Sequence, residues 1–126
     1  MQIYSTERET IKGPAEWFTG DVYIDPVHSP NEHTRVGSAH VRFTPGARTA
    51  WHFHPHGQVL YVTEGVGYVC RRGGEPQEIR QGDTVFIEPG EEHWHGATAS
   101  RYMCHVAIQE SDESGSPVTW LEHVED

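Results

Sequence analysis

Two histidine-rich stretches carry the side chains in this sequence that could do chemistry. The first, WHFHPHGQ, places His52 and His54 two residues apart and Gln58 four residues further on. The second, EEHWHG, repeats the spacing with His93 and His95. Side chains two residues apart on a strand project to the same face, so each pair could bind one ion. The spacing therefore predicts a metal site, provided that the fold brings the two stretches together.

The predicted ligands are His52, His54, Gln58 and His93. Imidazole nitrogens and an amide oxygen suit a divalent first-row metal, so Mn(II), Fe(II), Zn(II), Ni(II) and Co(II) all fit this set. The set contains no thiolate, which argues against a closed structural zinc site and for open positions that take water or substrate. Because Gln58 is neutral, the ion would keep more of its positive charge and act as a stronger Lewis acid.

Two further histidines, His95 and His105, are the catalytic candidates. His95 shares a strand face with His93, and His105 lies on a face with Met103 and Ala107. An imidazole can take or give a proton near neutral pH, so either could serve as a general base beside an open metal position. The alternative is that one of them only forms a hydrogen bond to a ligand histidine.

The elements that must position these residues read as many short strands separated by Gly and Pro turns. A turn signal every 8–12 residues and the absence of helical periodicity predict an all-β sandwich or barrel. A turn is expected at Glu64-Gly65, and Pro26 is expected to end the first strand. The expected strands cover residues 21–25, 36–43, 58–63, 66–71, 77–80, 84–88, 92–97, 102–110 and 118–124.

Alternation along these strands also predicts which apolar side chains face the metal. An apolar pocket for substrate is the functional interpretation, and ordinary barrel core is the alternative for each residue. Trp51 and Trp94 should face away from the metal by the same alternation. The candidate substrate-binding residues are Ala39, Val41, Phe43, Thr49, Leu60, Ala107 and Gln109.

Composition limits the protein class. A chain of 126 residues predicts one domain, residues 1–126. A net charge of −10 argues against nucleic acid and anionic membranes as partners, and no apolar run approaches a membrane span. We therefore expect a cytoplasmic protein with a small-molecule substrate. The two cysteines, Cys70 and Cys104, are expected to be free, buried thiols.

The first twenty residues read as an irregular arm. Trp17 and Phe18 form a hydrophobic pair that either plugs one end of the domain or packs on a partner subunit. Val59 and Tyr61 form an outward apolar face on a predicted strand. These features predict a homodimer or homotetramer, with the arm at the subunit interface.

The histidine stretches resemble the two motifs of the cupin superfamily. The first motif, G-x5-H-x-H-x3-E-x6-G, is matched by GARTAWHFHPHGQVLYVTEG, with Gln58 at the usual Glu position. The second is matched by GDTVFIEPGEEHWHGA through Gly82 and His93, with a shortened P-x-G turn and Ala97 in place of the usual Asn. The resemblance, over residues 38–108, implies a double-stranded β-helix, or jelly-roll barrel, that holds a metal inside.

The chain also resembles the small bacterial manganese-dependent cupin hydroxynitrile lyases, through strings such as KGPAEWFTGDVYIDP and VTWLEHV. That resemblance implies interconversion of a cyanohydrin with an aldehyde and HCN, with Mn(II) as Lewis acid. It also implies His105 as the base and His95 as an assisting group. The alternatives are a cupin dioxygenase that cleaves a β-diketone or phenolic substrate, and a non-catalytic cupin that binds a metal or small ligand.

Overall fold

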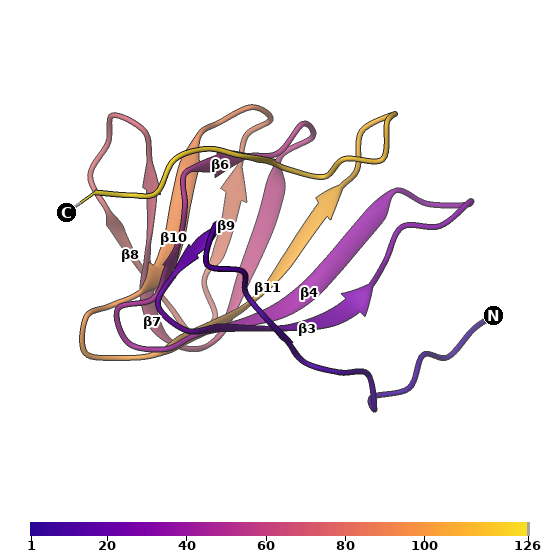
Figure 1. Cartoon of the computed structure of the whole chain (residues 1–126), viewed down its shortest axis with the longest axis horizontal. Coiled ribbons are helices and arrows are strands. Elements are labelled where there is room, and N and C mark those ends of the chain that lie inside the picture. Colours follow the sequence, from indigo (N-terminus) through magenta and orange to yellow (C-terminus); the bar gives the residue numbers. More distant parts are fainter. Residues whose placement is uncertain (126) are drawn as a thin grey trace.

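Strands joined by turns and loops make up the computed structural model, which describes residues 1–125 (Figure 1). Every pairing is antiparallel, and the sheet follows the order β1-β3-β4-β11-β7-β10-β5-β2. The strands are β1 (Ile11–Lys12), β2 (Phe18–Thr19), β3 (Val22–His28), β4 (Val36–Phe43), β5 (Arg48–Thr49), β6 (His52–Phe53), β7 (Gln58–Arg71), β8 (Gln77–Arg80), β9 (Thr84–Ile87), β10 (His93–Ala97), β11 (Met103–Glu110) and β12 (Thr119–Trp120). This arrangement confirms the predicted all-β fold. Asp126, the last residue of the expected domain, lies outside the described residues.

Strand β7 is the element that joins the two halves of the curled sheet. Its first half pairs with β9 and β11, and from Val66 onward it pairs with β8 and β10. The predicted turn at Glu64-Gly65 is therefore wrong, because the chain continues through this point as one strand of 14 residues. Gly65 makes this possible with a φ of +79°, at a place where any Cβ would overlap the carbonyl oxygen of Tyr102.

Two other predicted boundaries differ from the structure. β3 runs through Pro26 instead of ending there, and the register of its pairing with β4 shifts directly after the proline, between Pro26 and His28. Prolines inside strands are commonly found next to such irregularities. The strand predicted over residues 118–124 is reduced to β12. After β12 the chain is held by backbone hydrogen bonds, from Leu121 N–H to the Trp51 carbonyl and from Trp51 N–H to the Glu122 carbonyl.

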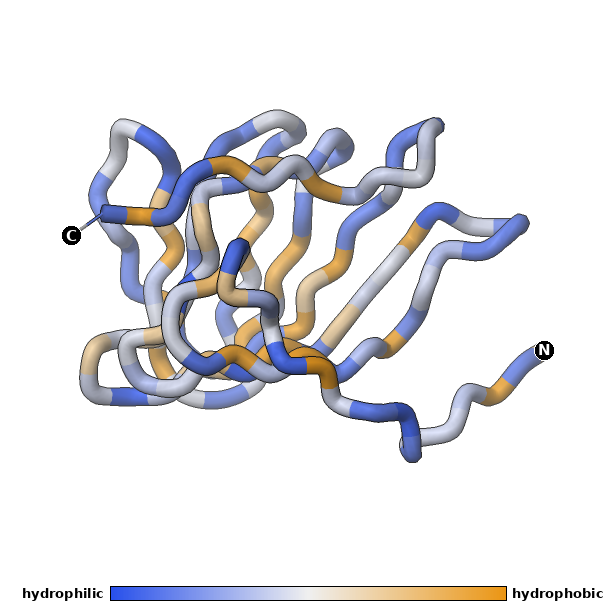
Figure 2. Tube along the Cα trace, in the orientation of Figure 1, coloured by the Kyte–Doolittle hydropathy of each residue, from blue (hydrophilic) through white to orange (hydrophobic). Residues whose placement is uncertain are grey.

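The core lies between the two halves of the sheet. Hydrophobic segments recur along the strands, and hydrophilic ones fill the connecting loops (Figure 2). The largest fully buried apolar side chains of the core are Phe43, Leu60 and Met103. No helix in residues 1–125 has the length and apolar character needed to cross a membrane.

The arm and the C-terminal segment close one side of the barrel. Trp17 stacks on Trp120 with ring centroids 5.4 Å apart, and Phe18 packs against the same indole at 5.6 Å. The hydrophobic pair of the arm thus plugs the domain from within the same chain. The segment before residue 10 extends away from the barrel, and Ile3 there is 91% exposed (Figure 1).

Candidate metal centre and catalytic cavity

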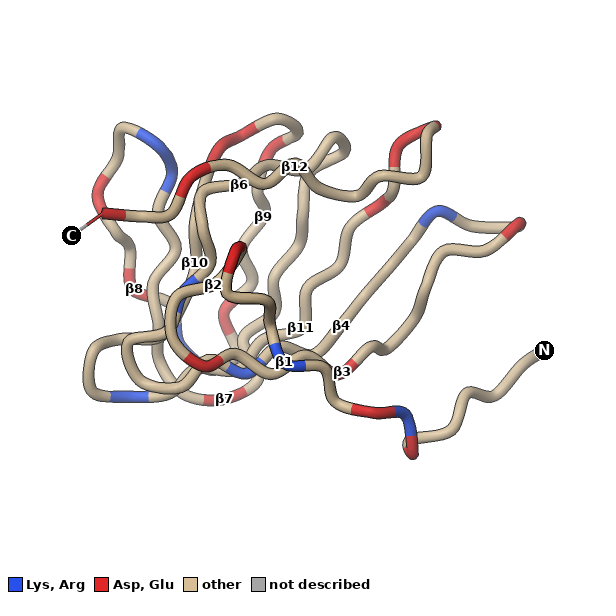
Figure 3. Tube along the Cα trace, viewed as in Figure 1, with Lys and Arg blue, Asp and Glu red and all other residues tan. Residues whose placement is uncertain are grey.

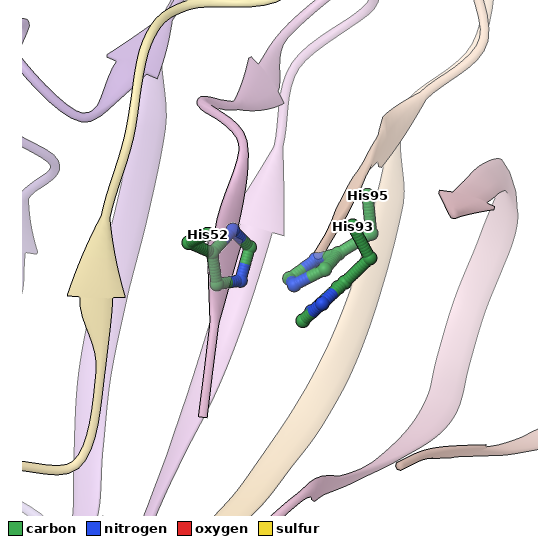
Figure 4. Close-up of side chains that lie close together, drawn as sticks. All are labelled: His52, His93 and His95. Atoms are coloured by element: carbon green, nitrogen blue, oxygen red, sulfur yellow. The ribbon is translucent and has the colours of Figure 1, made fainter. Parts of the chain in front are cut away.

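Antiparallel pairing brings the two histidine stretches together. His93 on β10 lies directly opposite His52 on β6, and His95 follows on the same face of β10. The three rings converge from these two strands (Figure 4). Their candidate ligand nitrogens all lie within 4.8 Å of one another, and all three side chains are buried. This cluster fits a metal-binding site, as the spacing predicts.

His54 reaches the same region from a turn. The spacing predicted that His52 and His54 share a strand. In the structure β6 ends at Phe53, so His54 lies beyond it. Gly57 tightens the turn with a φ of +80°, where a Cβ would lie 2.6 Å from the carbonyl oxygen of Ile87. The His54 ring centroid is 5.1 Å from that of His52 and 5.6 Å from that of His93. His54 nevertheless lies outside the tight group formed by His52, His93 and His95.

The three predicted ligand histidines are oriented in the same way. Nδ1 of each ring faces a backbone carbonyl: His52 that of Ala50 at 2.9 Å, His54 that of Pro117 at 2.8 Å, and His93 that of Glu91 at 2.8 Å. A carbonyl only accepts, so Nδ1 carries the proton and Nε2 presents its lone pair. Backbone support of this kind is what orients metal-binding imidazoles.

Burial keeps these rings neutral. Desolvation, the largest cause, brings the pKa of His93 to about 4 and holds the pKa of His52 well below its usual value. It also lowers the pKa of His54. Neutral imidazole is the form that binds a metal, so the ring nitrogens are available as ligands near neutral pH.

Gln58 offers the strongest sign that a cation belongs here. Its Oε1 lies 3.3 Å from Nε2 of His93, and the nearby Nε2 of His54 is buried without a hydrogen-bond partner among residues 1–125. With Nδ1 of His93 protonated, both atoms of the first contact are acceptors. Two converging acceptors in a buried site are stabilised by a cation between or beside them. The arrangement therefore fits a divalent metal held by imidazole nitrogens and an amide oxygen.

His95 and His105 form a hydrogen-bonded pair beside this cluster. Nε2 of His105 lies 2.9 Å from Nδ1 of His95, and Phe43 packs on both rings at centroid distances of 5.3 and 5.8 Å. Burial lowers the pKa of His105 to about 3 and that of His95 well below its usual value. Nε2 of His95 and Nδ1 of His105 have no hydrogen-bond partner among residues 1–125. The pair is thus neutral and retains an unused nitrogen at each end.

A cavity of about 190 Å³ adjoins both groups of histidines. Six of the predicted substrate-binding residues line it, whereas Leu60 does not, because it packs against Ile87 and Ala107 in a separate part of the core. Charged side chains lie mostly in the turns and loops (Figure 3), and none lines the cavity among the described residues. The predicted residues that line it are Ala39, Val41, Phe43, Thr49, Ala107 and Gln109.

Sequence reasoning missed the residues that close the cavity from the chain ends. These side chains come from the arm, from β3 and from the C-terminal segment. They are far in sequence from many of the residues that they contact in the site. Among them, Trp120 packs against a candidate metal ligand, with its ring centroid 4.6 Å from that of His52. Only the alternation in VTWLEHV hinted at an inward Trp120. The missed lining residues are Phe18, Ile24, Pro117, Val118 and Trp120.

The side chains expected to stay out of the chemistry do so. Trp51 lies under the guanidinium of Arg72 at 4.3 Å, Trp94 lies 5.5 Å from that of Arg48, and neither lines the cavity. Cys70 and Cys104 are free and buried, as expected.

Comparison with known proteins places this geometry in a family. The Cupin domain model matches residues 39–108. An (R)-mandelonitrile lyase of Granulicella tundricola is 54% identical over 115 residues, which cover 91% of this chain and 87% of that protein. A cupin-like protein of Thermotoga maritima, 35% identical, superimposes with a TM-score of 0.87 over 100% of this chain and 92% of that one. A predicted oxalate decarboxylase of Thermotoga maritima shares the fold at 21% identity, with a TM-score of 0.75 over 96% of this chain and all of that one. The chain belongs to the cupin family.

Proposed function

We propose that this protein is a metal-dependent hydroxynitrile lyase, which interconverts a cyanohydrin such as (R)-mandelonitrile with an aldehyde and HCN. The observation that carries the proposal is a neutral imidazole pair, His95 and His105, which faces the same uncharged cavity as the candidate metal ligands His52, His54 and Gln58. The 54% identity to an (R)-mandelonitrile lyase over most of both chains supports it.

The reaction needs one proton moved and one bond broken. The cyanohydrin hydroxyl loses its proton, the carbon–carbon bond to the nitrile breaks, and its electron pair leaves with cyanide as the carbonyl forms. Cyanide then takes up a proton and departs as HCN. No electron is gained or lost overall, so no redox partner is required.

The His95–His105 pair supplies the proton chemistry in this proposal. Its neutral rings can accept the hydroxyl proton and return it to cyanide within the cavity. Each ring keeps an unused nitrogen, so the pair can accept a proton without first losing a hydrogen bond to another group. We propose that the two histidines act as one acid–base unit, since the hydrogen bond between them allows both to share the accepted charge.

The metal ligands in this proposal are His52, His54, Gln58 and His93. Their support comes from the protonated Nδ1 atoms and from the acceptor contact between Gln58 and His93. His95 is left out because its Nδ1 contacts Nε2 of His105, which can donate or accept. A backbone carbonyl only accepts and would fix the proton on Nδ1. When bound, a divalent metal supplies Lewis-acid stabilisation of the charge that develops on the substrate oxygen. We propose Mn(II), since the chemistry needs no redox change.

The apolar lining suits an aromatic aldehyde. Phe43, Val41 and Ala39 form one wall of the cavity, and Ala107 lies opposite Ala39 on the neighbouring strand. Thr49 and Gln109 add polar groups at its edge. An uncharged wall excludes competing anions and water from the side of the substrate that carries the ring.

The test is an anaerobic mandelonitrile assay on protein whose metal content has been measured by elemental analysis. The Mn-loaded protein should release benzaldehyde at the same rate with and without O₂. Activity that requires O₂ would favour a cupin dioxygenase. If the metal-loaded protein releases no benzaldehyde in either atmosphere, the lyase proposal is wrong, and a non-catalytic cupin that binds a metal or small ligand is favoured.

We propose a homodimer or homotetramer, supported by an apolar outer face. Phe86, Tyr61 and Ile108 are 60%, 46% and 37% exposed, and Val59 lies opposite both Phe86 and Ile108 in the sheet. A second copy would cover this face. Light scattering on the purified protein measures the mass directly, and a monomer would refute this assignment.

We also propose a cytoplasmic location. The two free thiols, Cys70 and Cys104, suit a reducing compartment, which supports this location.

A further inference from the structure

We infer that Gln109 is a positioning residue that decides which end of the Gln58 amide faces the histidines. It acts through an amide relay, defined here as the Gly37 carbonyl, the Gln109 side chain and the Gln58 side chain. The inference rests on the metal site of the proposed function, but it does not depend on which reaction that site performs.

The relay follows from strand register. β11 lies between β4 and β7, and Gln109 is directly opposite Gly37 on one side and Gln58 on the other. Nε2 of Gln109 donates to the carbonyl oxygen of Gly37 at 3.3 Å. Nε2 of Gln58 donates to Oε1 of Gln109 at 3.1 Å. One amide side chain thus bridges the backbone of β4 and the side chain on β7.

The direction of the relay is set by its first member. A backbone carbonyl accepts and cannot donate, so Gln109 must turn its NH₂ toward Gly37. Its oxygen then faces Gln58, and this oxygen requires a donor. Gln58 must meet it with its own NH₂, which leaves Oε1 of Gln58 for the histidine cluster, 3.3 Å from Nε2 of His93.

The reversed amide would be useless for a metal. It would present an NH₂ group to the cluster, and an amide nitrogen bearing two protons offers no lone pair to a cation. Gln58 is 5% exposed, so water cannot easily replace a lost partner within the relay. Gln109 therefore stabilises the one orientation in which Gln58 can be a ligand.

The first experiment measures the dissociation constant for Mn²⁺ by competition with a chelator. Gln109→Met keeps the length of the side chain but removes its donor and acceptor, and we expect it to weaken Mn²⁺ binding by about tenfold or more, as for other groups that orient metal ligands. Gln81→Met makes the same replacement on an exposed turn outside the site and should leave the constant unchanged. Equal Mn²⁺ affinity in Gln109→Met and the parent protein would overturn the inference.

The second experiment observes the Gln58 NH₂ group directly by NMR in the metal-free, full-length protein. The parent should show a scalar coupling across the hydrogen bond from Gln58 Nε2 to the Gln109 carbonyl group. Gln109→Glu retains an acceptor facing Gln58 and should keep the slowly exchanging NH₂ signals of Gln58, whereas Gln109→Met should lose them. Fast exchange of these signals in the parent protein would refute the relay even if a variant failed to fold.

These measurements separate the relay from the proposed reaction. A weakened Mn²⁺ site in Gln109→Met together with no mandelonitrile cleavage by the parent would keep the relay and remove the lyase assignment. Unchanged Mn²⁺ binding together with normal cleavage would do the reverse.

Discussion

At the scale of single residues, His105 allows the proposed proton transfer to be tested separately from metal binding. His105 touches His95 and Phe43, and it does not belong to the tight cluster of His52, His93 and His95. We expect His105→Ala to lower kcat for mandelonitrile cleavage by at least about 100-fold, the usual contribution of a general base, while metal content stays at the parent level. Kinetics and elemental analysis on the same preparation measure both. Loss of the metal along with activity would make His105 a structural support of the site.

In the proposed metal site, the uncharged Gln58 would leave a bound divalent ion more positive than a carboxylate would. A carboxylate there would neutralise part of the charge of a bound divalent ion and would meet the oxygen of Gln109 without a proton to donate. We expect Gln58→Glu to bind Mn²⁺ at least as tightly as the parent but to lower kcat/KM for mandelonitrile by about tenfold or more. Gln81→Glu adds the same charge on an exposed turn and serves as the control. Full activity in Gln58→Glu would mean that ligand charge does not govern the rate.

At the scale of elements, the passage of β7 between the two halves of the sheet depends on Gly65. An alanine there would combine a φ of +79° with overlap of the Tyr102 carbonyl oxygen. We expect Gly65→Ala to lower the free energy of unfolding by more than about 2 kcal/mol in urea titrations.

The matched control for Gly65 is Gly73. Its φ is +84°, but no atom lies within 4 Å of an added Cβ. Gly73→Ala should cost only the backbone strain, about 1 kcal/mol. Similar losses in the two variants would show that the close approach of β7 to Tyr102 is not what requires glycine.

The C-terminal segment is the second element on which the site depends. Trp120 stacks on Trp17 and packs against His52, and the carbonyl of Pro117 receives Nδ1–H of His54. We expect Trp120→Ala to lower the free energy of unfolding by about 3 kcal/mol and to weaken Mn²⁺ binding, because His52 loses its support.

Thermal unfolding and metal titration of Trp120→Ala measure these two effects. Tyr102→Ala removes an aromatic ring that is 47% exposed and should change stability by less than about 1 kcal/mol. A Trp120→Ala variant with parent stability and parent Mn²⁺ affinity would show that the segment merely covers the barrel.

At the scale of the whole molecule, local signals predicted the sheet and the residues that its inner face carries. Alternation correctly placed Ala39, Val41 and Phe43 in one wall of the cavity. Of the two H-x-H pairs, His93 and His95 lie together in the cluster with His52, whereas His54 lies outside it. Period-two patterning works here because each inner face is buried and most connections between strands contain Gly or Pro.

What the sequence did not predict depends on contacts between distant segments. Glu64-Gly65 has the composition of a turn, and only its place opposite Met103 makes it part of a continuous strand. The closure of the cavity by Trp120 and the relay from Gly37 to Gln58 likewise arise from strand order, which local patterns do not encode. Leu60 was assigned to the cavity by alternation alone, but it packs against Ile87 and Ala107 and does not line the cavity.

The buried histidines make the whole fold sensitive to acid. Folding lowers the pKa of His93 to about 4 and that of His105 to about 3, and it lowers those of His52, His54 and His95 as well. The unfolded chain takes up protons on these rings near pH 6.5, where the folded protein does not. Stability is therefore complete above about pH 6.5 and falls as the pH drops toward the folded pKa values.

We expect the free energy of unfolding of the metal-free protein to decrease by up to about 1.4 kcal/mol per pH unit for each such histidine below pH 6.5. Urea titrations at about pH 7.5, 6 and 5 measure the slope of the free energy of unfolding against pH. His33→Gln is the control, because it removes an exposed histidine and leaves the five buried rings in place. A free energy of unfolding that stays constant between these pH values would mean that the rings take up protons without unfolding. The barrel would then tolerate charge in its interior, and the pKa values of these histidines would be the same in the folded and unfolded chain.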